Sequence, residues 1–319
     1  MKQEPFERAH REEWAAFEAL LARDRARRGP GPEGLPEAYR RLCRHLALAR
    51  RRCYTAGLVQ RLNGLVMAGH RALYASAPGL GPQWARFLTG GLARRTRALA
   101  RPVLVAAGLL LLPAALLPEV IRRQPEAAYL LVDPGTLARA ESMYQPGAMR
   151  LGRPGGAPAD VAMFGFYIWN NIRINFQAFA GGLLAGLGTV AVLLANGVQG
   201  GAVAGHLAQA GLGAQFWPFV ATHSALELPA LVLAGGAGLH LGWRLVAPGR
   251  RSRRRAVEEA ARDAMPLVFG AAFMDVLAAC LEAFWSANPQ VPAPVKLGAG
   301  AVLWSAVAAY FLLSGRRRA

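Results

Sequence analysis

The chain has 319 residues, of which 54% are hydrophobic, and it carries 37 Lys and Arg against 19 Asp and Glu, a net charge of +18. A basic excess of this kind is also the electrostatic footprint of a nucleic-acid-binding protein. Here the basic residues are concentrated between long apolar stretches, which is the distribution that the positive-inside rule predicts for a membrane protein. We therefore exclude nucleic acid as a partner and expect contact with membrane lipids.

The N-terminal region, residues 1–101, is polar and is expected to form a cytoplasmic helical domain. Apolar residues recur at helical spacing over three segments, 4–28, 36–54 and 58–74. The next segment, 84–101, combines large apolar side chains with several arginines. That composition indicates an amphipathic helix at an anionic membrane surface, which would form an interfacial elbow before the first membrane span.

The second domain, residues 102–319, is expected to be an all-α polytopic membrane bundle. A run of about 20 apolar residues can span a bilayer. Five stretches come near this standard: 103–121, 176–195, 219–246, 266–285 and 297–314. A sixth, 198–214, is short and rich in Gly and Ala, and it either spans the membrane, re-enters it or lies at its surface. The dipeptide Asn196-Gly197 is a turn signature and is expected to connect two crossings.

The charges of the connecting segments predict the orientation. The Pro-rich linker 122–160 has balanced charges and should be extracytoplasmic, and the aromatic segment 161–171 should form an interfacial helix after it. The loop 244–263 and the tail 316–318 are basic and should be cytoplasmic. Two cytoplasmic termini require an even number of crossings, about six. The expected location is the bacterial cytoplasmic (inner) membrane.

Closely spaced glycines predict tight helix packing, since small residues let transmembrane backbones approach each other. The same property also suits a homodimer. The glycines concerned are Gly181, Gly182, Gly186, Gly188, Gly200, Gly201 and Gly205.

Ionisable side chains inside the apolar stretches are the most informative residues, because such groups are costly at bilayer depth and usually face a protein interior. His223 and Glu227 are four residues apart and share one helix face. Pro229 follows and is expected to kink that helix. The predicted buried polar core consists of Asn170, Asn171, Asn175, Asn196, His223, Glu227, Asp275 and Glu282.

This polar core admits four interpretations. A histidine bonded to a carboxylate can fix helix packing. His206, His223 and Glu227 would also suit a transition metal, which is the one cofactor that the sequence suggests. Such groups can instead relay protons, or a buried Glu can act as an acid or base. The sequence has no recognised catalytic signature, so we predict no catalytic residue and favour a protein that is not an enzyme.

At these positions the chain resembles the stage II sporulation protein M family of integral membrane proteins. The residues that carry the resemblance are Leu62-Asn63, His70, Leu73-Tyr74, Asn170-Asn171, Asn175-Phe176, Gly182, Gly186, Thr189, Asn196-Gly197, His223 and Glu227-Leu228-Pro229. Members usually have Gly directly after the histidine, where this chain has Ser224. The resemblance implies a membrane partner of peptidoglycan hydrolases rather than a hydrolase.

Two functions are therefore expected, from different classes. The first is a scaffold or assembly protein of the cell envelope that organises envelope or cytoplasmic proteins, such as cell-wall remodelling enzymes. The second is a small transporter, channel or intramembrane metalloenzyme. Its site would be built from His206, His223, Glu227, Asp275 and Glu282.

Overall fold

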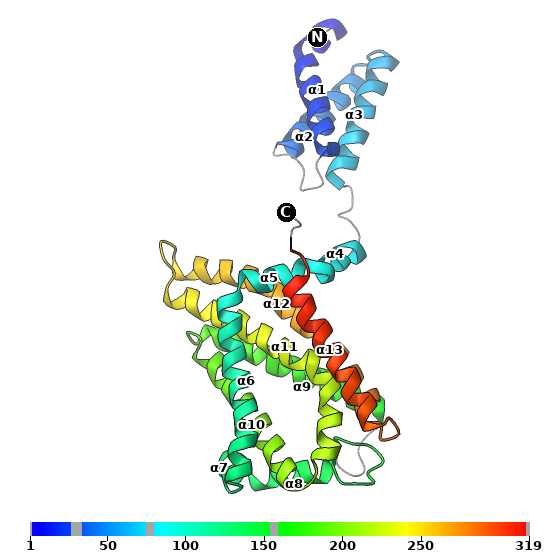
Figure 1. Ribbon diagram of the computed structural model, residues 1–319. Helices are drawn as coiled ribbons and strands as arrows, with labels where there is room; N and C mark the ends of the chain where they lie inside the picture. Colours follow the sequence, from blue (N-terminus) through cyan, green and yellow to red (C-terminus); the bar gives the residue numbers. More distant parts are fainter. Residues whose placement is uncertain (1, 27–33, 75–79, 154–158, 317–319) are drawn as a thin grey trace. The chain divides into compact units, whose positions relative to one another are not determined.

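The computed structural model describes residues 2–26, 34–74, 80–153 and 159–316, and within these residues every regular element is helical (Figure 1). The predicted all-α class is therefore confirmed. The chain divides into two compact units, Met1–Gln83 and Trp84–Ala319.

The first unit consists of three helices whose apolar stripes form a common core. Their bounds are α1 Gln3–Ala26, α2 Leu35–Arg51 and α3 Ala56–Tyr74, close to the predicted segments. Phe6, Trp14 and Phe17 recur at helical spacing on α1 and are buried, since an amphipathic helix turns its apolar face to its neighbours. Gly34 precedes α2 with φ 92°, a backbone conformation that glycine adopts readily.

A cluster of polar rings lies at one edge of this core. His10 and His45 stack with ring centroids 3.9 Å apart, and the Trp14 indole N–H donates to His45 Nδ1 at 3.2 Å. Ligand atoms of His10, Glu13 and His45 lie within 4.8 Å of one another. Because Nδ1 of His45 is an acceptor, neutral His45 carries its proton on Nε2, the nitrogen that faces Glu13. Nε2 lies 3.8 Å from Glu13 Oε2. A metal ion at this position would need a lone pair on Nε2, so a protonated Nε2 disfavours a metal site.

Acidification should destabilise this first unit. Burial, and next the neighbouring His10, lower the pKa of His45 below its ordinary value of 6.5. The unfolded chain then binds protons more readily than the folded one, so stability is complete above about pH 6.5 and is lost as the pH falls below it. Hydrogen exchange of full-length protein in detergent, corrected for intrinsic rates, should show less protection in α1 and α2 at about pH 5 than at about pH 7.5. The pH effect should shrink in His45→Gln; an undiminished effect would contradict this origin.

The predicted elbow helix is interrupted and packs against the membrane-embedded helices. It consists of α4 Leu80–Arg86, a π-helical turn Phe87–Gly91 and α5 Leu92–Ala98, with non-helical backbone at Gly90. Leu92 is buried and packs at Gly270 of α12, Arg253–Cys280. Arg97 donates to the carbonyls of Phe311 and Ser314, both at 2.5 Å. Arg97 therefore caps the C-terminal end of the last helix, Ala293–Leu313. The second unit begins at Trp84, whereas the charge pattern placed the whole segment 84–101 in the N-terminal domain.

Within the described residues of the second unit, five helices are long and apolar enough to cross a membrane. They are α6 Ala100–Arg123, α10 Leu187–Gln209, α11 Gly213–Val246, α12 Arg253–Cys280, which continues as the π-helical turn η3 Leu281–Ser286, and α13 Ala293–Leu313. Helix α11 packs against all the others and against α9, Asp160–Ala180. It is the central element of the bundle.

The boundaries predicted around α9 and α10 were wrong. Residues 161–171 and the start of the predicted span 176–195 form one helix, α9, and Asn196-Gly197 lies inside α10 rather than in a turn. The chain reverses instead at 181–186, where Gly186 has φ 87°. The side chain of Asn196 donates to the Val192 carbonyl of its own helix at 2.7 Å. Residues 198–209 therefore continue α10, and no separate sixth segment exists there.

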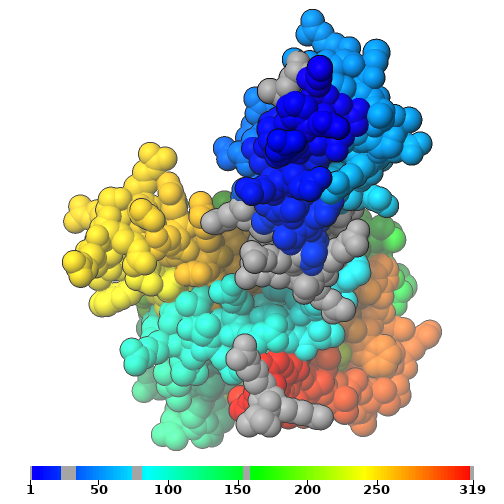
Figure 2. All heavy atoms as spheres, turned by 90° about the horizontal axis from the view of Figure 1, so that it is seen from above, coloured from blue at the N-terminus to red at the C-terminus, as the bar shows by residue number. Residues whose placement is uncertain are grey.

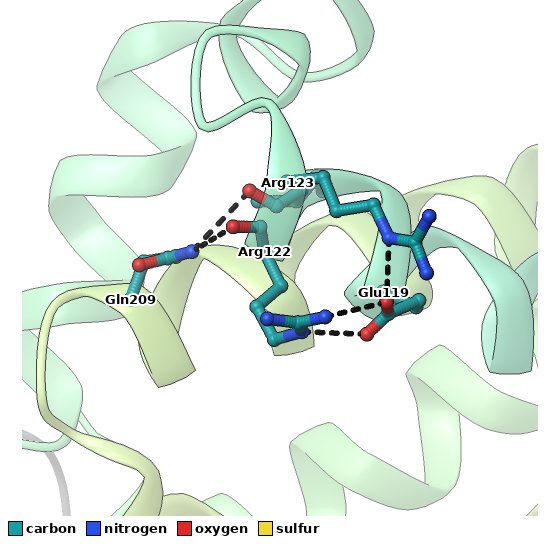
Figure 3. Close-up of polar contacts among 5 residues, drawn as sticks. Glu119, Arg122, Arg123 and Gln209 are labelled. Atoms are coloured by element: carbon teal, nitrogen blue, oxygen red, sulfur yellow. Dashed lines mark hydrogen bonds and ion pairs between the residues drawn. The ribbon is translucent and has the colours of Figure 1, made fainter.

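Contacts at the helix ends define two opposite faces of this unit (Figure 1). The basic face carries α5, the connection 247–252 between α11 and α12, and the end of α13; Figure 2 looks onto it. The linker face carries α7 Ala127–Leu131 and α8 Pro134–Met143, which form within the predicted linker 122–160. At this face α6 ends with Glu119 bonded to Arg122 and Arg123, while Gln209 of α10 donates to the Arg122 carbonyl at 2.9 Å (Figure 3). Helices α6 and α9 to α13 run between the two faces in alternating direction.

Most of the predicted packing glycines are in contact within one chain. A Cβ atom at Gly182 would meet the Gly238 carbonyl of α11, and one at Gly201 would meet the Pro113 carbonyl of α6. Gly197, which the sequence placed in a turn, packs in the same way against the Leu110 carbonyl of α6. Gly200 has nothing within 4 Å of such an atom. Intrachain packing thus accounts for these glycines, and a homodimer stays a prediction.

Candidate functional site

His223 and Glu227 lie on α11, on the helix face that turns toward α12. His223 is buried and Glu227 is partly buried. The predicted pairing on one face is present, because residues four apart on a helix are neighbours. Pro229 lies within the continuous helix α11.

The partner of this pair is Glu282, which the sequence placed in the polar core but not in the ligand set. Ligand atoms of His223, Glu227 and Glu282 all lie within 4.8 Å of one another. His223 Nδ1 lies 3.0 Å from the Ser286 hydroxyl. When Nδ1–H donates to that hydroxyl, Nε2 keeps a free lone pair, which is the usual arrangement for a metal-ligating histidine.

Glu282 and Ser286 belong to the π-helical turn η3, in which Ala287 N donates to the Glu282 carbonyl at 3.2 Å, five residues back. A π turn adds one residue to a helical turn and is frequent at functional sites. The added residue rotates the following part of the helix. Glu282 and Ser286 are four residues apart, so they lie on one side of the helix and both face the same histidine.

Donors from outside the helix bind the carbonyls at the end of η3. Arg153 Nη2 donates to the Ala283 carbonyl at 2.7 Å, Lys296 Nζ to the Ser286 carbonyl at 2.7 Å, and the Leu151 amide to the Ala287 carbonyl at 3.1 Å. The last carbonyls of a helix have no partner of their own, so these donors stabilise the turn that carries Glu282. Arg153 is itself fixed by Asp160, with Nη1 and Oδ1 2.7 Å apart.

A second acidic position adjoins the first. Asp275 is fully buried on α12, and Asn175 of α9 donates to its Oδ2 at 2.5 Å. Its Oδ1 has no hydrogen-bond partner among the described residues. Asp275 also lies within electrostatic range of Glu227.

The three carboxyl groups of Glu227, Asp275 and Glu282 lack basic partners. In the part of the chain that the structure describes, no Lys, Arg or His forms an ion pair with any of them. Buried charges are normally paired, neutralised by protons or bound to a metal. This cluster therefore needs bound protons or a cation.

The other predicted residues are distributed differently. His206 is buried at the linker face, where its Nε2 lies 2.7 Å from Glu141 of α8. His206 is not among the three clustered ligands. The predicted metal set of His206, His223 and Glu227 is therefore not brought together. Asn171 is buried with its amide nitrogen unpartnered among the described residues, while Asn170 and Asn196 are half-buried.

Sequence reasoning missed Arg153, Ser286 and Lys296. Arg153 lies in a charge-balanced linker, and Ser286 is a common residue at a helix end. Lys296 offered the best signal, because it is one of only two lysines and lies beside an apolar stretch. A cation in that position is expected to have a specific partner.

The model of the stage II sporulation protein M family matches residues 126–287, just over half of the chain and the whole cluster around His223. The chain belongs to the stage II sporulation protein M family. A second model, a domain of unknown function (DUF8413), matches residues 4–75. The match to the sporulation protein M family thus begins after the N-terminal helices. The residues of those helices that carried part of the resemblance, Leu62-Asn63, His70 and Leu73-Tyr74, lie outside it. No curated protein and no solved structure matches the chain.

Proposed function

We propose that this member of the sporulation protein M family crosses the bacterial cytoplasmic membrane six times, with both termini in the cytoplasm. Helix α9 supplies the sixth crossing, because it runs between the same two faces as the five apolar helices. Its buried polar residues, Asn171 and Asn175, face the bundle, where Asn175 meets Asp275. The arginines of α5 and of the 247–252 connection support a cytoplasmic basic face.

For its function, we propose that the bundle holds a divalent transition-metal ion at His223, Glu227 and Glu282. The single observation that carries this proposal is the approach of three ligand atoms to within 4.8 Å in a cluster without a basic ion-pair partner. One histidine and two carboxylates suit zinc and similar metals. An intramembrane ionisable group is a functional site by default, which favours a transporter or membrane metalloenzyme over a simple packing role.

Metal analysis of detergent-purified protein tests this proposal. Wild type should contain about one transition-metal ion per chain, and His223→Ala and Glu282→Gln should each lose it. His206→Ala is the matched control: it removes an equally buried histidine that bonds Glu141 instead, and it should keep the metal. If wild-type protein contains no metal after incubation with zinc or manganese salts, the proposal is wrong, and protons neutralise the carboxyl groups of the cluster.

A scaffold role is the second candidate, favoured by the separate compact unit Met1–Gln83. A transport or catalytic site in the bundle does not need this unit, whereas recruitment of envelope or cytoplasmic proteins does. We expect affinity capture from cross-linked membranes to return reproducible partners with the full chain and to lose them when residues 1–83 are deleted. Capture that returns the same proteins with both forms would contradict this role.

A further inference from the structure

A hollow of about 520 Å³ opens at the linker face. It lies between the segment 145–151, the start of α11 and the start of α13. Pockets of this size are in the range that small molecules and headgroups occupy. Its polar lining side chains are Gln145, Gln215 and Lys296, and the remaining ones are mostly apolar.

Lys296 is an unpaired cation in this hollow. Its side chain is almost completely buried, with 2% of the residue exposed. The ammonium group has three donors, and its one hydrogen bond is to the Ser286 carbonyl. Among the described residues no carboxylate lies within ion-pair distance of it. A buried charge without a counter-ion is costly, so the position favours an anion from outside the chain.

A second polar group in the hollow is also unsatisfied. The buried Oε1 atom of Gln215 has no partner among the described residues. A side-chain amide can present either its oxygen or its NH₂ group at the same position by rotation, so Gln215 can donate to an anion beside Lys296. Met149, Leu151 and Val291 provide apolar surface around the two polar groups.

We propose that this hollow binds a ligand through a carboxylate or phosphate group, with the Lys296 ammonium as its main contact and the Gln215 amide as the second. The apolar side chains cover the organic part of the ligand. The site adjoins the cluster at His223 through Ser286, whose carbonyl accepts from Lys296 and whose hydroxyl contacts His223, but it binds the opposite charge. It is reached from the face that carries α7 and α8.

The scarcity of lysine provides a direct reporter. Lys2 and Lys296 are the only two lysines of the chain, so protein labelled with ¹³C at lysine Cε gives two signals in a neutral detergent. Lys296→Arg identifies which signal is which. Inorganic phosphate and acetate, titrated at constant ionic strength with chloride, should shift the Lys296 signal saturably and leave Lys2 unchanged. Nanodiscs with phosphatidylglycerol, compared with phosphatidylcholine alone, test a lipid source of the same group.

Each outcome decides a point. A saturable shift with free ions indicates a soluble ligand, and a shift with phosphatidylglycerol alone indicates a lipid headgroup; both support the site. Gln215→Leu keeps Lys296 as the reporter and should weaken the apparent affinity roughly tenfold, as loss of a hydrogen bond to a charged group does. No saturable change with either source, or equal shifts at Lys2 and Lys296, would overturn the proposal.

Discussion

Replacing Gly197 by valine should leave little folded protein in the membrane. A side chain at this position of α10 would meet the backbone carbonyl of Leu110 on α6. Backbone cannot move aside as a flexible side chain can, so the two helices must separate. Overpacking of this kind costs about 3 kcal/mol or more, a large part of the stability of a typical domain.

Gly200→Val is the matched control, because Gly200 lies on the same helix and a Cβ atom added there would have nothing within 4 Å. Both variants lose one glycine and gain the same β-branched residue, so their helix propensities change equally. The measurement is the yield of monodisperse protein on size-exclusion chromatography in detergent, together with its melting temperature. Equal losses in the two variants would show that α6 and α10 do not pack at Gly197.

Arg153→Met should produce the second large effect. This buried guanidinium joins Asp160 at the start of α9 to the Ala283 carbonyl in η3. Removing one partner of a buried pair costs about 3–5 kcal/mol, and the lower end applies here because Asp160 is partly exposed. The variant should lose thermal stability and, where it folds, bind metal at His223 more weakly, because η3 is then less constrained.

Arg150→Met provides the comparison, since Arg150 bonds the other oxygen of Asp160 at 2.9 Å but is 42% exposed. An exposed pair contributes about 1 kcal/mol or less. Differential scanning fluorimetry in one detergent compares the two variants directly. A melting temperature that falls equally in both would mean that burial of Arg153 contributes nothing to stability.

Hydropathy predicted the bundle correctly where its signals are long. The apolar stretches around α6, α11, α12 and α13 are confirmed, and so is the shared face of His223 and Glu227. Such features depend on averages over many residues or on the fixed geometry of a helix. They change little with the surroundings.

The errors arose where local signals were ambiguous. Asn196-Gly197 and the glycines at 181–186 are both turn signatures, and only the packing of Gly182 against Gly238 places the reversal at 181–186. The position of His206 depends on Glu141, which comes from a linker where no helix was expected. Ser286, which contacts His223, lies in a π turn whose carbonyls bind Arg153 and Lys296 from distant segments. No local pattern contains these contacts.

The π turn at 281–286 also has a consequence for comparing relatives. Such a turn amounts to a one-residue insertion in an otherwise regular helix. In an alignment, a relative with a single-residue gap between Glu282 and Ser286 would keep every apolar position of α12 and also the glutamate, because these residues precede the gap. The residues after the gap, Ser286 among them, would turn by about 100° around the helix axis, away from the histidine. Conservation of length in this stretch is therefore a guide to whether a relative keeps the contact between the serine and the histidine.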